Sequence, residues 1–287
     1  MSTEITKAFV EQYSSNIQML SQQKGSLLRD KVRLESVTGK NAFFDQIGSV
    51  TATVRSTRHS DTPQADTPHS RRRVSLVDYE FADLVDDLDK VRMLVDPTSS
   101  YAQAAAFAMG RAMDDAIITA ATGAADTGVA GGTSVALPSG QKIAETGTVG
   151  LTIAKLREAK EILDLASVDP SIPRYIVVSP KQVTDLLGTT EVTSSDFNTV
   201  KALAQGDVST FLGFNFCVSN RLSIASSKRK CFAFAQDGLA LAVGKDSTAR
   251  IDERSDKGYA TQVYYSAAFG ATRMEEDKVV KIQAYEA

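Results

Sequence analysis

The sequence contains no tryptophan, two histidines and two cysteines in 287 residues. These scarcities leave few of the side chains that nucleophilic catalysis and metal binding require. No run of about 18 apolar residues is present, so the sequence predicts no membrane-spanning helix. A formal net charge of −3 gives no overall positive field that would attract nucleic acid. The polar start Met1–Lys7 lacks the apolar core of a secretory signal, which predicts a chain made in a cytosol.

The composition is otherwise that of a folded protein, with 43% hydrophobic and 23% charged residues. This length allows one large domain or two modest ones with a full core. Cys217 and Cys231 each lie in an apolar run that is typical of a strand. Because a disulfide is unexpected in a reducing compartment, we expect two buried, reduced cysteines that only pack.

The most distinctive segment is Ser56–Arg73, about 18 residues without one large aliphatic side chain. Loops of this length in compact domains are usually functional or disordered. Alternating, β-branched runs lie on both sides, over residues 31–54 with a clear pattern at 47–54, and over 74–81. The pattern predicts a long β-hairpin that projects from the body and depends at its tip on outside contacts.

The N-terminal half also has helical patterns, which predict helices over residues 3–28, 83–94 and 97–122. The third is the clearest, because Asp96 is a good N-cap, Pro97 suits the first helical position and Gly123 suits the residue past the end. A helix of about 25 residues is about 37 Å long. Small side chains at every fourth position predict a face that another element can approach closely: Ala104, Ala108, Ala112 and Ala116.

The second half has a mixed α/β pattern after a loop over residues 122–150 that contains one short hairpin. Helices are predicted over residues 153–166, 180–187 and 198–203. Strands are predicted over residues 174–178, 214–218, 231–235, 260–271 and 278–285.

Candidate chemical sites are weak. His59, Asp61, Asp66 and His69 share one loop, but a metal bound there would lack the second shell that orients its ligands. The acidic run that begins at Asp83 lacks the glycine and the alternating oxygen ligands of a calcium loop. The glycines of residues 123–132 do not end in Gly-Lys-Ser/Thr, and no Gly-x-Ser-x-Gly elbow exists. The sequence therefore predicts no enzyme, no catalytic residue, no cofactor and no metal ligand.

Three adjacent cations, Arg71, Arg72 and Arg73, end the long loop. They could bind phosphate, but alternate arginines of a strand point to opposite faces, where they can meet carboxylates of a neighbouring element. We expect the second arrangement. Candidate partners, in the same or an adjacent subunit, are Asp83, Asp86 and Asp87. We also expect charge reversal of Arg72 to impair assembly while leaving the monomer folded.

The order of these parts and several local segments resemble the major capsid proteins of tailed bacteriophages. One such segment is Thr62–Arg72, which is similar to the extended loop of a subgroup of these proteins. Residues 96–102 and 110–115 are similar to its spine helix, and residues 197–203 and 210–214 to its axial segments. The resemblance covers nearly the whole chain.

The resemblance implies the Hong Kong 97 type of capsid fold, an α+β fold with a long spine helix and a mixed α/β axial domain. Its parts would be an N-terminal arm (1–46), an extended β-hairpin loop (47–80), a peripheral domain (81–147, with the spine helix at 97–122), an axial domain (148–255) and closing peripheral strands (256–287). The implied function is self-assembly into the icosahedral head that encloses double-stranded DNA.

The implied partners are copies of the chain in hexamers and pentamers, a portal protein, a decoration protein and packaged DNA bound without sequence preference. The implied location is the virion, after assembly in the host bacterial cytoplasm. Some relatives crosslink subunits through a loop lysine and an asparagine, but residues 56–73 contain no lysine, so we expect a noncovalent hold. Because the arm begins near Met1, we also expect a separate scaffolding protein.

Two other functions remain open at this point. An encapsulin-like compartment shares the fold but encloses an enzyme. An α/β enzyme could be built on residues 152–242, although this block lacks a nucleophile–base pair and a phosphate loop.

Overall fold

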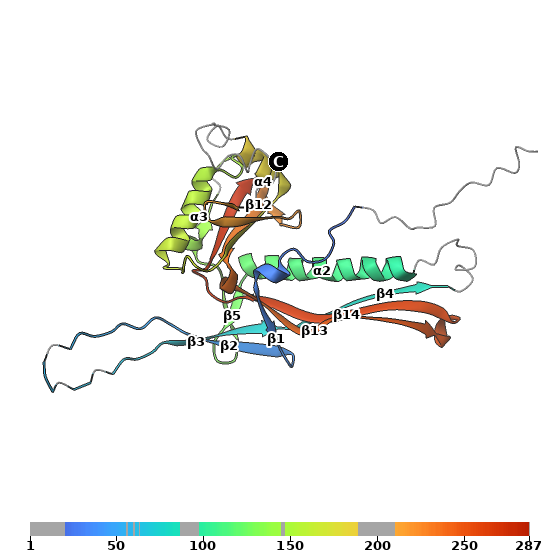
Figure 1. The fold of residues 1–287 in the computed structure, drawn as a ribbon, viewed down its shortest axis with the longest axis horizontal. Helices are drawn as coiled ribbons and strands as arrows, with labels where there is room; N and C mark the ends of the chain where they lie inside the picture. Colours follow the sequence, from blue (N-terminus) through green and yellow to red (C-terminus); the bar gives the residue numbers. More distant parts are fainter. Residues whose placement is uncertain are drawn as a thin grey trace, which may run out of the picture. The chain divides into compact units, whose positions relative to one another are not determined.

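We analysed a computed structural model, which describes residues 21–55, 57–59, 61–62, 64–86, 98–144, 147–188 and 210–286. The chain divides into two compact units. The first unit contains Met1–Ser26, Asp78–Arg111 and Lys245–Ala267, and the second contains Leu27–Val77, Ala112–Gly244 and Ala268–Ala287. Figure 1 shows the elements and their labels.

Three sheets and three helices carry the described structure. One sheet has the order β1 (Arg33–Ser36), β13 (Leu239–Arg254), β14 (Ala260–Arg273) and β4 (Val77–Val85). The second has the order β2 (Asn41–Ile47), β3 (His69–Ser75), β5 (Ala125–Thr127) and β6 (Thr133–Val135). The third has the order β7 (Lys142–Ile143), β15 (Val279–Tyr285), β12 (Lys228–Ala235), β8 (Arg174–Val178), β10 (Phe214–Val218) and β9 (Thr210–Phe211), with β11 (Ile224–Ala225) on β12. The helices are α2 (Thr98–Thr122), α3 (Ile153–Leu165) and α4 (Pro180–Leu187), and 3-10 turns lie at Arg29–Lys31, Ser139–Gln141, Gln236–Gly238 and Ser255–Lys257.

The third sheet carries a buried core, and in it β8 pairs in parallel with β10 and antiparallel with β12. Phe232 and Phe234 of β12 are fully buried, with ring centroids 5.6 Å apart. Burying such a side chain contributes about 1.5–3 kcal/mol. Cys217 and Cys231 are both buried and free, as predicted.

Most predicted elements of this half are confirmed. The strands over residues 174–178 and 214–218 and the helix over 180–187 match their predicted bounds. The predicted strand 231–235 begins earlier, at Lys228, and the short hairpin in the loop is β5–β6. The predicted helix over 198–203 lies outside the described residues.

The long hairpin is present, but its ladder is shorter than the sequence predicts. β2 and β3 pair from Asn41–Ser75 to Ile47–His69, and the amide of Gly48 donates to the carbonyl of Pro68 over 2.9 Å. Beyond this point the two legs leave the sheet as an extended loop (Figure 1). In the predicted strand over 47–54, Ile47 is therefore the last residue in the ladder, and residues 49–54 pair with none of the strands that the structure describes. The opposite leg contains prolines, which cannot donate ladder hydrogen bonds.

The base of the hairpin is fixed by a small core. Val74 of β3 packs with Val37 and Ala242, and Ala42, Phe44 and Leu76 pack against this group. The hairpin is thus anchored in the second unit although its outer part is solvent-exposed.

The spine helix is confirmed as α2, which ends at Thr122, and the amide of Gly123 donates to the carbonyl of Thr119. Its predicted caps, Asp96 and Pro97, lie outside the described residues. The buried stripe differs by one position from the predicted alanine face and consists of Ala105, Met109, Met113, Ile117 and Ala121. The close approach that we expected at the alanines occurs instead at Gly110, where an added Cβ would lie 2.4 Å from the carbonyl carbon of Gly25.

Two predicted helices are wrong in their described parts. Residues 21–28 are irregular, with Gly25 at a φ of 76°, and residues 3–20 lie outside the described structure. The predicted acidic helix over 83–94 overlaps β4, which continues to Val85, so Asp83 lies on a strand. Pairing of β4 with β14 overrides the local helical spacing. Residues 87–94 are outside the described structure.

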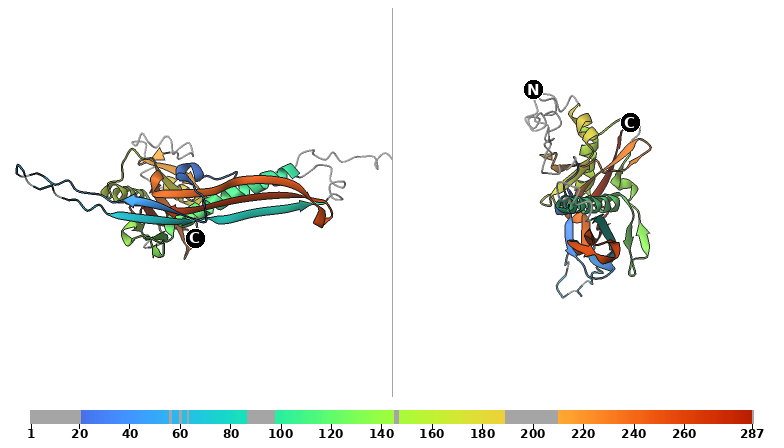
Figure 2. Two further views of the ribbon diagram at one scale, coloured as in Figure 1. Left: turned by 90° about the horizontal axis from the view of Figure 1, so that it is seen from below. Right: turned by 90° about the vertical axis from the view of Figure 1, so that its right-hand side faces the viewer.

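The sequence did not predict β13. This strand and β14 lie side by side along their length (Figure 2). Residues 244–253 of β13 are all exposed, so they lack the apolar alternation that marks a strand in sequence.

Candidate assembly surface at the base of the hairpin

The three arginines lie on β3 and alternate between its two faces. Arg71 stands opposite Asp45 of β2 in the ladder and donates to both of its carboxylate oxygens. The hydrogen bonds that Arg71 donates to Asp45 lower the pKa of the Asp45 carboxyl and raise the pKa of the Arg71 guanidinium. The guanidinium also lies 5.6 Å from the ring centroid of Phe43. This exposed pair is a cross-strand contact on the open face of the hairpin base.

Arg73 makes the second cross-strand pair. It stands opposite Asp126 of β5, and its Nη2 lies 2.6 Å from the Asp126 carboxylate. Gly131, at a φ of 65°, lies in the β5–β6 connection, where an added Cβ would be 2.5 Å from Cδ of Arg73. A glycine is needed here both for the backbone angle and for the close packing on the arginine stem.

Arg72 points to the opposite face and is buried. Its Nε donates to the carbonyl of Met274 over 2.9 Å, and its Nη2 pairs with Glu276. Glu276 is shared with Arg273, whose side chain is fully buried. Arg273 also donates to the carbonyls of Gly123 over 2.6 Å and Val135 over 3.0 Å. Desolvation lowers the pKa of Arg273, Glu276 raises it, and Arg72 lowers it.

This buried network ties β3 to the β14–β15 connection, to the end of α2 and to β6. Each of the three arginines therefore meets a carboxylate of a neighbouring element of its own chain, in the alternating arrangement expected from the sequence. The partners are Asp45, Glu276 and Asp126 rather than the predicted acids.

The predicted acids have other positions. Asp83 belongs to the first unit and accepts a hydrogen bond from the amide of Leu84 over 2.9 Å. Asp86 also belongs to the first unit, and Asp87 lies outside the described residues. A contact of these acids with arginines of an adjacent subunit stays a prediction. Sequence reasoning missed Asp126 and Glu276 because they lie far away in the chain, whereas the hairpin register would have indicated Asp45.

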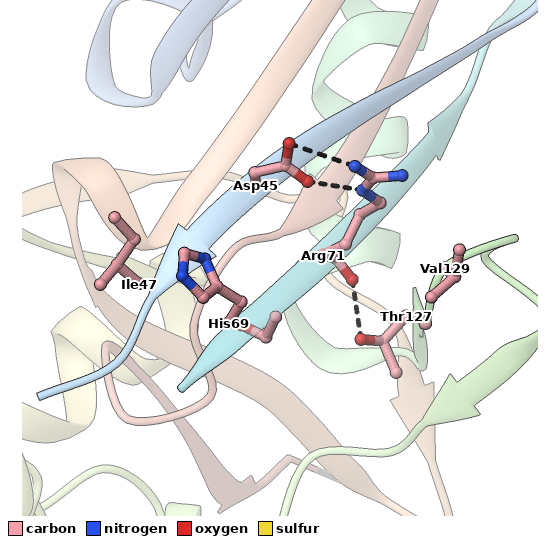
Figure 3. A pocket seen from close by; sticks show the side chains of 8 residues that line it. Asp45, Ile47, His69, Arg71, Thr127 and Val129 are labelled. Atoms are coloured by element: carbon pink, nitrogen blue, oxygen red, sulfur yellow. Dashed lines mark hydrogen bonds and ion pairs between the residues drawn. The ribbon is translucent and has the colours of Figure 1, made fainter. Parts of the chain in front are cut away.

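An open hollow of about 630 Å³ lies beside the Arg71–Asp45 pair. Figure 3 shows Ile47 and Val129 at its rim, and Thr127 Oγ1 donating to the carbonyl of Arg71 over 2.8 Å. Ile47 is 70% exposed and Val129 is 87% exposed. Within the described ranges, no group of three or more His, Cys, Asp or Glu side chains could hold a metal ion. The hollow therefore combines exposed apolar side chains with an ion pair, which is a combination typical of surfaces that bind another macromolecule.

Among the described helices, none is long and apolar enough to cross a membrane. No curated protein matches the sequence. The sequence model of the phage capsid protein family matches residues 5–286, which is nearly the whole chain.

Solved capsid structures have the same fold. The capsid of cyanophage P-SCSP1u is 18% identical with a TM-score of 0.76, and the match covers 100% of this chain and 96% of that one. The capsid of Ralstonia phage GP4 is 12% identical with a TM-score of 0.73, covering 97% and 96%. The capsid of the native GTA particle is 14% identical with a TM-score of 0.72, covering 100% of both.

These matches confirm the predicted Hong Kong 97 type of fold and favour a phage head over an encapsulin-like compartment. They also indicate a structural protein rather than an α/β enzyme. The chain belongs to the phage capsid protein family and is a major capsid protein that forms the head of a tailed phage.

Proposed function

We propose that copies of this chain assemble as hexamers and pentamers and that the projecting hairpin holds neighbouring copies together without a covalent bond. The observation that carries this proposal is the exposure of the hairpin. Val50 is 56% exposed and Val54 is 94% exposed, on a loop that no described part of its own chain covers. Apolar side chains on a solvated projection indicate an interaction site. Residues 56–73 contain no lysine for a crosslink.

The family membership supports the roles that the sequence analysis assigns to the segments of the chain. The arm (1–46) and the loop (47–80) would contact neighbours, and the peripheral and axial parts (81–147, 148–255 and 256–287) would form the body. A separate scaffolding protein, a portal protein and a decoration protein are the proposed partners, and the host bacterial cytoplasm is the proposed place of assembly. Small pairwise affinities are sufficient because a shell sums many interfaces.

The proposed cargo is double-stranded DNA. A cluster of three lysines on one face of the third sheet supports this proposal. Lys281 of β15 stands next to Lys142 of β7, and Lys230 of β12 is its diagonal neighbour across the ladder. Among the described residues, none of the three is in an ion pair. Desolvation, Lys230 and Lys142 all lower the pKa of Lys281. Lysines at neighbouring ladder positions repel one another, and a bound polyanion such as DNA would compensate this repulsion.

The test of the hairpin proposal is a deletion. Replacing residues 49–67 by a short Gly-Ser turn should leave a folded protein, because these residues lie outside the ladders of the second unit. Shell formation by the shortened chain, measured by negative-stain electron microscopy, should be lost. Normal shells from the shortened chain would show that the hairpin is not required.

A further inference from the structure

The buried arginine network at the base of the hairpin carries more positive than negative charge. The side chains of Arg72 and Arg273 are 9% and 0% exposed, and both pair with one carboxylate, that of Glu276. Arginine stays protonated in proteins, so neither group can lose its charge to relieve the imbalance. The network therefore has a net charge of +1 (two cations and one anion).

The acids next to Glu276 in the sequence do not supply the missing negative charge. Glu275 is paired with Lys278 over 2.6 Å, and Asp277 accepts a hydrogen bond from Gln141 over 3.4 Å. In the described structure, the ion pairs of the two buried arginines all come from Glu276. An uncompensated charge in a buried site is costly, so the network requires a further anionic group.

Each of the two guanidinium groups also has a buried N–H group that is free to donate. Within the described part of the chain, Nη1 of Arg72 and Nε of Arg273 have no acceptor. Buried polar groups nearly always have a hydrogen-bond partner. A water molecule can accept from these donors, but it brings no charge, whereas an anion both accepts and neutralises. Arg73 also has a buried Nε without an acceptor, but its charge is balanced by Asp126.

We propose that a small monovalent inorganic anion, such as chloride, binds beside Arg72 and Arg273 at the N–H groups that have no protein acceptor. Glu276 brings the two guanidinium groups together, because Arg72 lies on one of its carboxylate oxygens and Arg273 on the other. Since both arginine side chains are at least nine-tenths buried, the site suits a halide ion rather than an organic anion.

The bound ion would strengthen the anchor of the hairpin and not its outer part. The network joins β3 to the β14–β15 connection, to the end of α2 and to β6, and all of these residues belong to the second unit. The inference concerns the single folded chain, so it does not rest on the proposed self-assembly.

The first test is the stability of unassembled full-length protein against chloride concentration, with sodium gluconate keeping the ionic strength constant. A ligand that binds only the folded chain, at one site, raises the ratio of folded to unfolded protein about tenfold for each tenfold rise in ligand above its dissociation constant. Urea denaturation should show this slope with chloride and with bromide. Equal stability in chloride and in gluconate at every concentration would overturn the proposal and leave water as the partner of the free donors.

Two variants separate a bound ion from a general effect of salt. Arg72→Met removes one cation and one free donor and leaves Glu276 and Arg273 at equal charge, so the dependence on chloride should be lost. The matched control Arg71→Met makes the same change in net charge at an exposed pair and should keep the wild-type slope. Equal slopes in the two variants would overturn the proposal, because chloride would then act on the chain as a whole.

Hydrogen–deuterium exchange of the wild-type protein gives a second readout, which holds even if Arg72→Met does not fold. Chloride at ten times its dissociation constant, in place of gluconate, should slow exchange about tenfold in peptides that cover residues 71–75 and 272–277. Peptides from the exposed residues 247–253 should be unaffected. The same slowing in all of these peptides, or in none, would contradict an ion bound at this network.

Discussion

Arg72 and Arg273 are two buried guanidinium groups that share one carboxylate, Glu276. The Nη1 and Nη2 atoms of Arg273 also donate to two backbone carbonyls, those of Gly123 and Val135. A buried charge that loses its partner is strongly destabilising, whereas an exposed pair contributes little. Arg71 and Arg72 are neighbours of the same residue type, but they therefore have different roles in the stability of the fold.

Charge reversal tests this difference. Arg72→Glu places a carboxylate beside Glu276 and should lower the free energy of unfolding by about 3–5 kcal/mol, as measured by urea denaturation. The matched variant Arg71→Glu, at an exposed pair, should leave the urea midpoint nearly unchanged. The sequence predicts that reversal at Arg72 spares the fold, whereas the buried position of Arg72 in the structure predicts a loss of stability. Similar midpoints for the two variants would contradict the buried network.

The ionised carboxyl of Glu286 makes the stability of the folded chain depend on pH. Hydrogen bonds from Arg229 lower the pKa of this carboxyl to about 2, with further hydrogen bonds from Ser179 and Gln182, while burial opposes the shift. The ordinary value is 4.5. The folded state therefore gains stability from Glu286 above about pH 4.5 and loses it as the pH falls toward 2.

Glu286→Gln should remove this dependence. The variant should have a lower urea midpoint than the wild type at pH 7. The gap should shrink at pH 3, because Glu286 is then mostly protonated in the unfolded chain and still mostly ionised in the folded one. A gap of the same size at both pH values would mean that Glu286 is not the titrating group.

At the scale of elements, the sequence predicted best where the hydrophobic period is strong and the partners lie nearby. The helix α3 and the strands β8 and β10 are examples. It failed at β13, whose residues 244–253 are all exposed and mostly polar, so that only pairing with β14 defines them. It failed at β4 because Leu84, Leu88 and Val91 have helical spacing, and a long-range ladder overrides this signal. The arginine partners were missed for the same reason, since Asp126 and Glu276 reach β3 only through the tertiary fold.

The packing of residues 21–28 against α2 gives a further prediction. Gly110 has no space for a side chain, because an added Cβ would lie 2.4 Å from the backbone of Gly25. Gly110→Ala should lower stability by about 1–3 kcal/mol, measured by thermal unfolding. Gly132→Ala is the control, since nothing lies within 4 Å of its added Cβ. A control that is equally destabilised would show that the effect comes from the loss of glycine and not from packing.

At the scale of the whole molecule, the net charge is −3, but three lysines form a local positive cluster. If Lys142, Lys230 and Lys281 contact DNA phosphates, replacing all three by glutamine should weaken binding of a short duplex by purified capsomers. The slope of log affinity against log salt concentration should fall by about 0.9 per lysine removed. Replacing Lys24, Lys40 and Lys257 by glutamine gives the same change in net charge. An equal fall in both variants would contradict a specific DNA-facing cluster.

The central claim is that this chain builds a closed shell from copies of itself, and electron microscopy of the purified full-length protein tests it most directly. We predict uniform closed shells, tubes or ring-shaped capsomers. Small featureless particles at every concentration, from protein that is folded by circular dichroism, would contradict the claim.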